Sequence, residues 1–126
     1  MSICLYAGGK ALVIAASAFT LSWTHSVEKI RWEEDWLLTP QGFRIVEARV
    51  KGTGAGMEIP EGAVLSDGAW AYAPKLKAQP RIVLAQSGAT GSGWQICGEG
   101  VCRTVGKAAG EPAEIRACGD GRAPAQ

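Results

Sequence analysis

The chain has 126 residues, with 13 basic and 12 acidic side chains and a formal net charge of +1. This length is typical of a single domain with its own core. Because the charges nearly balance, we expect no nucleic-acid binding. No apolar run reaches the roughly 20 residues that cross a bilayer, so no membrane span is expected.

Apolar and polar residues alternate over short segments, which predicts one β domain over residues 1–105. Gly8-Gly9 is typical of a hairpin turn, and Pro40-Gln41-Gly42 predicts a second turn. The glycine-rich segment 51–62 is expected to be a long loop. Strands are expected at 2–7, 10–15, 19–25, 29–38, 43–50, 63–65, 69–72, 81–86, 93–97 and 101–105.

The strand spacing predicts an all-β fold, a compact antiparallel β-sandwich or small open barrel of about eight to ten short strands. Beyond residue 105 the sequence offers few apolar side chains and many small residues. We therefore expect residues 106–126 to form a flexible C-terminal tail.

The chain has four cysteines, and whether they form disulfides indicates the cellular compartment of the protein. Gly98-Glu99-Gly100 can turn a hairpin that brings Cys97 and Cys102 together, either as a disulfide or as two reduced thiols. The spacing of Cys4 and Cys118 indicates nothing. The apolar run after Lys10 is short for a signal peptide, so we favour reduced thiols and the cytoplasm, with the cell envelope or periplasm as the alternative.

Residues 23–36, W-T-H-S-V-E-K-I-R-W-E-E-D-W, contain the one histidine and three of the five tryptophans. In the strand alternation His25 and Glu34 fall on the apolar faces. One interpretation is a small-ligand pocket, which needs aromatic walls and a few convergent polar groups. Its residues would be His25, Ser26, Glu28 and Glu34, walled by Trp23, Trp32 and Trp36. The alternative is a structural lock, with a core histidine and a buried ion pair.

Two hairpin registers fit this stretch. A two-residue turn at Val27-Glu28 pairs Trp23 with Trp32 and Leu21 with Glu34, whereas a longer loop places His25 opposite Glu34. In either register, a carboxylate beside tryptophans needs a partner or access to water. The candidate partners of Glu34 are Arg31, Arg44, Arg49 and His25.

The sequence gives little support to catalysis, so we lean against an enzyme and predict no catalytic residue, metal or cofactor. Ser26 and His25 are neighbours on a strand and point to opposite faces, and no G-x-S-x-G motif is present. One histidine without a C-x-x-C pair makes a zinc site improbable. Gly54 and Gly56 lie in a loop that lacks the P-loop ending and the dinucleotide-binding spacing.

The segments F-T-L-S-W-T-H-S-V-E-K-I-R-W-E-E-D-W, G-T-G-A-G-M-E-I-P and W-Q-I-C-G-E-G-V-C together resemble a family of small bacterial domains of unknown function, number eighteen-fifty. Its signature is a His-Ser-Val-Glu segment, a later glutamate and a Gly-x-Gly-x-Gly loop, which correspond to His25–Glu28, Glu34 and Gly54-Ala55-Gly56. The resemblance covers roughly residues 3–104.

The resemblance implies an accessory role in solute uptake, because genes of this family often lie beside those of TRAP transporters of the TAXI kind. We therefore expect a non-enzymatic accessory or ligand-binding domain, whose partner is a TRAP/TAXI transporter component or a small organic solute. One alternative is a small metal-dependent or acid/base enzyme centred on His25 and nearby carboxylates. Another is a structural module that binds a protein through a sheet edge.

Overall fold

The computed structural model describes residues 2–24, 31–51, 62–66, 68–86, 93–106 and 110–118. The fold class is all-β, as predicted, with eleven strands in these ranges. No helix in the described ranges is long and apolar enough to cross a membrane. The strands are β1 (Ile3–Ala7), β2 (Lys10–Ile14), β3 (Ala18–Thr24), β4 (Arg31–Thr39), β5 (Gly42–Lys51), β6 (Val64–Ser66), β7 (Ala69–Tyr72), β8 (Ile82–Gln86), β9 (Trp94–Gly98), β10 (Val101–Val105) and β11 (Gly110–Ala117).

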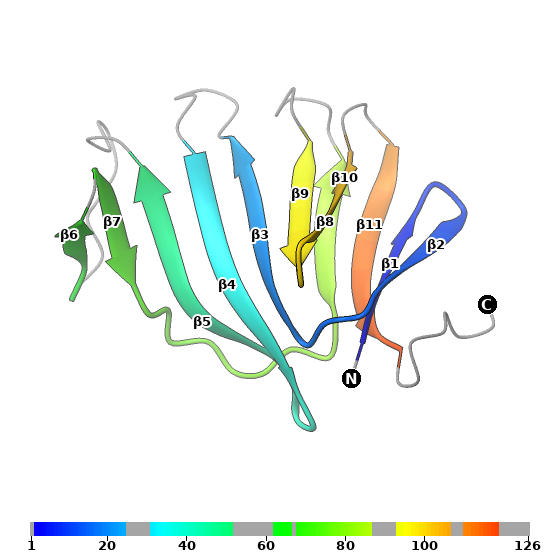
Figure 1. The fold of residues 1–126 in the computed structure, drawn as a ribbon, viewed down its shortest axis with the longest axis horizontal. Coiled ribbons are helices and arrows are strands. Elements are labelled where there is room, and N and C mark those ends of the chain that lie inside the picture. The colour runs from blue at the N-terminus through cyan, green and yellow to red at the C-terminus, as the bar shows by residue number, and fades with distance from the viewer. Residues whose placement is uncertain are drawn as a thin grey trace.

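The strands form two antiparallel sheets (Figure 1). The smaller has four strands in the order β2-β1-β11-β8, and the larger has seven in the order β10-β9-β3-β4-β5-β7-β6. Among the described strand pairings none joins one sheet to the other. The architecture is therefore a two-layer sandwich rather than a closed barrel.

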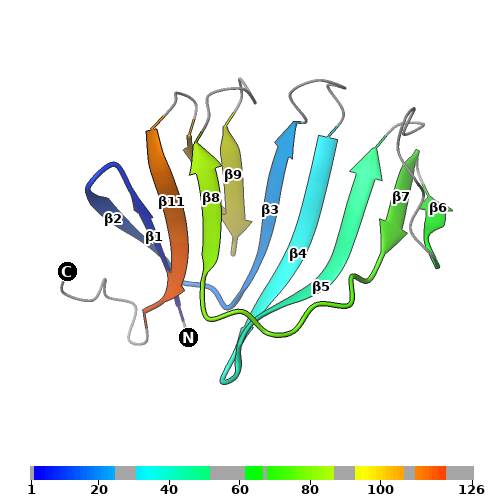
Figure 2. The ribbon, with the colours of Figure 1, turned by 180° about the vertical axis from the view of Figure 1, so that it is seen from behind.

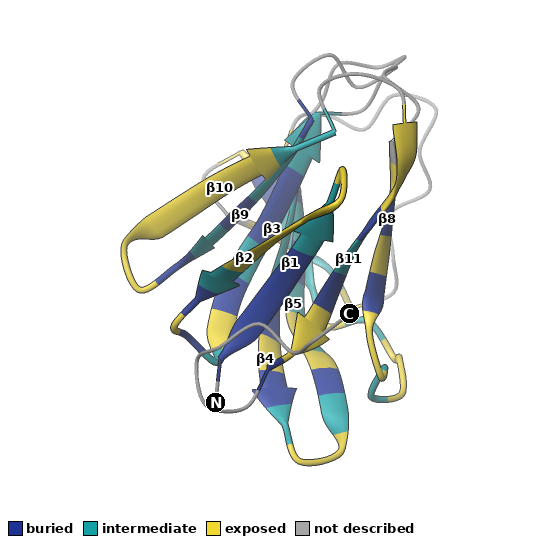
Figure 3. Cartoon of the chain, turned by 90° about the vertical axis from the view of Figure 1, so that its right-hand side faces the viewer, coloured by how far each residue is buried: buried dark blue, intermediate teal, exposed yellow. Residues whose placement is uncertain are grey.

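The core lies between the two sheets because apolar residues alternate with polar ones along the facing strands. Leu5 and Ile115 of the smaller sheet and Leu21, Phe43 and Ile96 of the larger are at most 2% exposed. The Phe19 and Phe43 rings meet edge to face, with their centroids 6.0 Å apart. By contrast β10, at the edge of the larger sheet, is exposed along most of its length (Figure 3).

Residues 110–117 correct the prediction of a flexible tail. They form β11, which lies between β1 and β8 in the smaller sheet. Only two of its side chains, Ala113 and Ile115, are fully buried, and both are 0% exposed. The apolar signal in this segment was too weak to predict a strand, and the strand is held by pairing with segments distant in sequence.

The hairpin of β3 and β4 has the first of the two predicted registers. Trp23 pairs with Trp32 and Leu21 pairs with Glu34, which excludes the register that places His25 opposite Glu34. On its other edge β4 pairs with β5, with a register shift between Asp35 and Trp36. Val46 is the extra residue at this bulge and is 55% exposed. Because of this extra residue, Phe43 before the bulge and Ala48 and Val50 after it all point into the core.

The segment between β7 and β8 runs along one end of the larger sheet, beneath β5 and β4 (Figures 1 and 2). It is tied there by two backbone hydrogen bonds between Phe43 and Gln79, of 2.7 and 2.8 Å. Gly42 makes this approach feasible, since its φ is +120° and a Cβ atom would lie 2.6 Å from the Gln79 carbonyl oxygen.

Two disulfides link the strands. Cys97 and Cys102 face each other across the β9–β10 hairpin, with Cα atoms 4.1 Å apart, and are bonded. Cys4 of β1 is bonded to Cys118, which follows β11. The disulfide alternative, rather than the favoured pair of reduced thiols, is therefore the state of the β9–β10 hairpin in this structure.

Candidate functional site

Three tryptophans lie side by side on the core-facing side of the larger sheet. Trp23 of β3 stacks on Trp32 of β4, with ring centroids 6.1 Å apart and planes 9° apart. On its other side Trp23 contacts Trp94 of β9, with centroids 4.8 Å apart. We call Trp94, Trp23 and Trp32 the aromatic row. Each of the three is partly exposed, so they form a surface at the margin of the core.

The register of the larger sheet produces this row. Trp23 pairs with Trp32, and Trp32 pairs with Val50 of β5. Leu21 pairs with Ile96, so continuing the same antiparallel register brings Trp94 beside Trp23. Trp23 and Trp94 also pack against the core cluster, and Trp32 extends the row toward β5.

The indole N–H groups near the row differ in their hydrogen bonding. Trp94 donates to the Ala85 carbonyl oxygen of β8 at 2.9 Å, which bridges the two sheets. Trp36 donates to Glu34 Oε1 at 3.0 Å. Trp32 Nε1 is shielded from solvent and has no hydrogen-bond partner among the described residues. A buried donor of this kind is costly unless it is bonded, which makes Trp32 the unsatisfied member of the row.

Glu34 lies next to the row on the same face of β4. Its neighbours on the flanking strands are Leu21 and Ala48, which are 2% and 1% exposed. Burial among these apolar groups raises the pKa of Glu34, and the hydrogen bond from Trp36 opposes that rise. Its carboxyl is thus an oxygen acceptor held in partly dry surroundings.

Tyr72 of β7 extends the polar part of the site. It pairs with Ala48, which in turn pairs with Glu34, so both side chains lie on the same face of the sheet. Burial raises the pKa of Tyr72, and the negative charge of Glu34 raises it further. The Tyr72 phenol therefore stays protonated at neutral pH and keeps its O–H donor.

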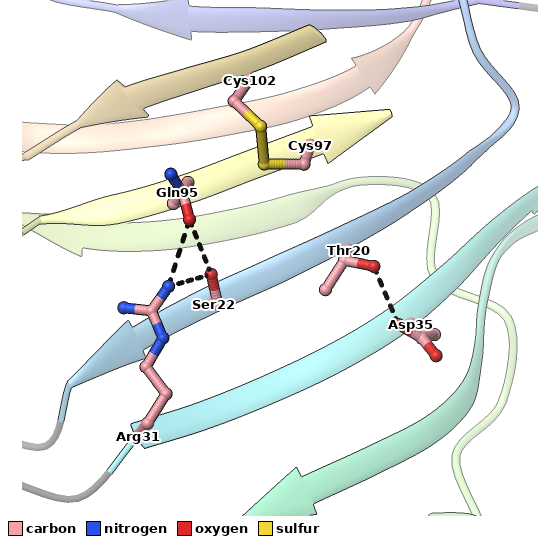
Figure 4. The surroundings of a disulfide bond; sticks show 7 residues. All are labelled: Thr20, Ser22, Arg31, Asp35, Gln95, Cys97 and Cys102. Carbon is pink, nitrogen blue, oxygen red and sulfur yellow. Dashed lines mark hydrogen bonds between the residues drawn. A yellow bond between two sulfur atoms is a disulfide. The ribbon is translucent and has the colours of Figure 1, made fainter. Parts of the chain in front are cut away.

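The predicted arginine partners of Glu34 serve the opposite face of the sheet. Arg49 donates to Asp35 through two nitrogens, at 2.7 and 2.9 Å, and to Glu33 at 3.2 Å and Glu47 at 3.0 Å. Thr20 also donates to Asp35, at 2.8 Å (Figure 4). The hydrogen bonds and charge of Arg49 hold the pKa of Asp35 below its usual range.

Arg31 belongs to a second polar group on this opposite face. Its Nη2 donates to Ser22 Oγ at 2.6 Å and to Gln95 Oε1 at 3.1 Å. Ser22 is only 4% exposed beneath it. Figure 4 shows this group beside the Cys97–Cys102 disulfide. On this part of the opposite face, the polar side chains around Arg31 and Arg49 are thus hydrogen-bonded to one another.

The structure brings together part of the predicted site. Trp23 and Trp32 are in contact, Glu34 lies beside them, and Trp36 is a core residue, 6% exposed, that bonds Glu34. The remaining predicted residues, His25, Ser26, Glu28, Gly54 and Gly56, lie outside the described residues.

Sequence reasoning missed Trp94 and Tyr72. Residues two positions apart in a strand share a face, so the sequence shows that Trp94 lies on the same face as Ile96, and Tyr72 on the same face as Trp70. It does not show which strands pair, and only the pairing brings these side chains to β3 and β5. The sequence therefore predicted that Trp94 and Tyr72 lie in strands, but not that they belong to the site.

The aromatic row combines apolar ring faces with a few polar groups. The indole faces supply apolar contact, Trp32 has an unsatisfied N–H donor that is shielded from solvent, Tyr72 has an O–H donor, and Glu34 has an acceptor. Within the described part of the chain, no group of three or more His, Cys, Asp or Glu residues is arranged to hold a metal ion.

Comparison with known proteins gives one match. Searches of curated proteins and of solved structures found no match. The model of a family described as a domain of unknown function, DUF1850, matches residues 19–105. The matched range begins in β3 and ends with β10, and so includes the aromatic row, Glu34 and Tyr72. Because the match covers more than half of the chain, this protein belongs to the DUF1850 family of domains of unknown function.

Proposed function

We propose that this protein is a non-enzymatic domain that binds a small organic solute on the aromatic row and serves as an accessory to a TRAP/TAXI-type uptake system. The solute places an apolar or aromatic portion against Trp23 and Trp32. A hydrogen-bond acceptor of the solute takes the Trp32 N–H, and a donor reaches Glu34.

The observation that carries the proposal is the unpartnered indole N–H of Trp32 beside the half-buried Glu34. Buried polar groups in proteins are nearly always bonded, and those that are not call for an explanation such as a ligand or a water. A structural lock would instead pair these groups with each other or with neighbouring side chains. Trp36 and Trp94 make such bonds, whereas Trp32 makes none within the described residues.

The two disulfides support a location in the cell envelope. All four cysteines of the chain are in disulfides, and such bonds persist in oxidising compartments such as the periplasm. The periplasm is also where a solute would meet an uptake system before transport. The link to TRAP/TAXI transporters draws its support from the gene neighbourhoods that the family resemblance implies.

A thermal-shift screen tests the binding proposal. The purified protein is heated with each of a set of carboxylic acids, amino acids and amines. A solute at a hundred times its dissociation constant adds about 2.7 kcal/mol to the free energy of unfolding, a readable rise in Tm.

Each hit is then repeated on matched variants. Trp32→Phe removes the N–H but keeps a ring, and Glu34→Gln removes the charge but keeps the shape. Both are expected to abolish the rise in Tm. Glu47→Gln makes the same chemical change on the opposite face of the sheet and should leave it intact. Hits that are unchanged in both site variants would disprove binding at the aromatic row.

A further inference from the structure

The two disulfides of the chain differ in their exposure to solvent. Cys4 is 0% exposed and Cys118 is 8% exposed, so the protein encloses the bond between them. In the other disulfide Cys102 is exposed and Cys97 is partly exposed. Thiol–disulfide exchange needs direct contact between a thiolate and one of the two sulfur atoms. In the folded state the Cys97–Cys102 bond is therefore the more accessible of the two.

The Cys97–Cys102 bond lies at the edge of the larger sheet, on the face opposite the core. Ile96 is 0% exposed in the core, so its neighbour Cys97 and the pairing partner Cys102 point to the other face, away from the aromatic row. The strand β10 is the last of its sheet and is exposed along most of its length (Figure 3). Among the described strands, none pairs with the free edge of β10 to cover the Cys102 side of the bond.

The surroundings favour Cys102 as the sulfur that a thiolate attacks. A thiolate approaches a disulfide in line with the S–S bond, on the side away from the sulfur that leaves. At Cys97 this approach comes from the side of β3, where Thr20 pairs with Cys97 and donates a hydrogen bond to Asp35 (Figure 4). At Cys102 the approach comes from the free edge of β10. Because access limits the exchange rate, attack at Cys102 is the less hindered route.

The β9–β10 hairpin has other interactions that hold its shape. Gly98 pairs with Val101, which leaves Glu99 and Gly100 as a two-residue turn. Their φ angles are +51° and +76°, and a type I′ turn, the common two-residue hairpin turn, requires positive φ at both positions. The two strands are also paired along their whole length. The turn and this pairing keep β10 in place when the disulfide is open.

We propose that the Cys97–Cys102 bond is a site of thiol–disulfide exchange, which a dithiol reduces while the Cys4–Cys118 bond stays closed. A thiolate of the dithiol attacks Cys102 Sγ, the S–S bond breaks, and the electron pair leaves on Cys97 Sγ. The second thiolate of the dithiol then attacks its partner sulfur in the mixed disulfide and releases Cys102. The dithiol becomes a disulfide, and the two protons that it loses end on Cys97 and Cys102. The protein gains two electrons and keeps its fold.

Timed reduction of the folded full chain with dithiothreitol tests the proposal. Samples are alkylated with iodoacetamide and digested with trypsin, which leaves Cys97 and Cys102 in the peptide 82–103 and the other two cysteines in the peptides 1–10 and 117–122. Mass spectrometry then follows the two bonds separately. Cys97 and Cys102 are expected to be alkylated at least about tenfold faster, because their bond is the exposed one. Equal rates, or earlier opening of the buried bond, would overturn the proposal.

Reduction in a urea concentration that unfolds the chain is the matched control. Both disulfides are then open to the reagent, so the ratio of the two rates should fall toward one. An unchanged ratio would show that the sequence around each cysteine, rather than the fold, sets the rates, and would refute the argument from exposure. The amide NMR spectrum of the selectively reduced protein should keep the signal dispersion of a folded chain. Loss of that dispersion would show that the bond is required for the fold and contradict the proposal.

Glutathione, a monothiol, identifies the sulfur that is attacked. It remains bonded to that sulfur in the mixed disulfide, and rapid alkylation with iodoacetamide caps the sulfur that is released. Fragmentation of the peptide 82–103 in the mass spectrometer distinguishes the two positions. At early reaction times we expect glutathione on Cys102 and the alkyl group on Cys97. The reverse pattern would rule out attack from the free edge of β10.

Discussion

Glu34 and Asp35 are consecutive residues of β4 with opposite electrostatic surroundings. The alternation of the strand places Glu34 among apolar side chains of the inner face, where burial raises its pKa. Asp35 points to the outer face, where the hydrogen bonds and charge of Arg49 lower its pKa. Folding therefore disfavours the ionised form of Glu34 and stabilises the ionised form of its neighbour Asp35.

The raised pKa of Glu34 predicts a pH-dependent effect of its substitution. Because the folded state holds this proton more tightly, the stability that Glu34 contributes is fully present below its ordinary pKa of 4.5. That contribution is lost as the pH rises through the raised value. The stability of Glu34→Gln relative to the native chain should therefore increase as the pH rises from 4 to 8. Urea unfolding at both pH values measures this difference. A difference that is constant, or that falls with pH, would mean that burial does not raise the pKa of Glu34.

The strands show how far sequence patterns reach at the level of elements. Local alternation predicted the bounds of most strands within a residue or two, because the face to which each side chain points follows from the sequence of that strand alone. The β3–β4 register followed from one of the two turns considered. The strand β11 was missed, because a segment with Pro112 and three charged residues has little alternation, and its partners β1 and β8 are distant in sequence. Trp94 was missed as a site residue for the same reason.

The glycine at the start of β5 gives a prediction at this scale. Gly42→Ala should lower stability by about 2–4 kcal/mol, because the residue has positive φ and the new methyl group would collide with the Gln79 carbonyl. Gly8→Ala is the matched control, with φ +57° but open space around it, and should cost only about 1 kcal/mol. Thermal unfolding of both variants compares them. Equal losses would mean that the contact between β5 and the β7–β8 connection is unimportant.

The whole molecule is held by covalent links as well as by its core. Cys4 and Cys118 are separated by 114 positions, and their disulfide joins the first strand to the end of the last. Cys97 and Cys102, separated by 5 positions, close only one hairpin. Because β1 and β11 are neighbours in the smaller sheet, the long-range disulfide stabilises the layer that lies mostly outside the matched family range.

Removal of each disulfide should therefore have unequal effects. In the chain-entropy model, closing the longer loop is worth about 5 kcal/mol and closing the hairpin loop about 2 kcal/mol. Replacing Cys4 and Cys118 by alanine should lower the free energy of unfolding about twice as much as replacing Cys97 and Cys102. Urea unfolding of the two double variants under oxidising conditions measures both losses. A larger loss from the hairpin pair would show that local strain or packing dominates over loop closure.

Binding of a solute at the aromatic row would engage the unsatisfied N–H of Trp32. Nitrogen–proton NMR spectra resolve the indole signals of the five tryptophans, and the Trp32→Phe variant assigns the one of interest. The spectra are recorded with each solute that raises the Tm. We expect the Trp32 signal to move downfield on binding, while the signals of Trp36 and Trp94, already bonded to Glu34 and Ala85, move less. A Trp32 signal that stays in place at saturating solute would contradict binding at the aromatic row.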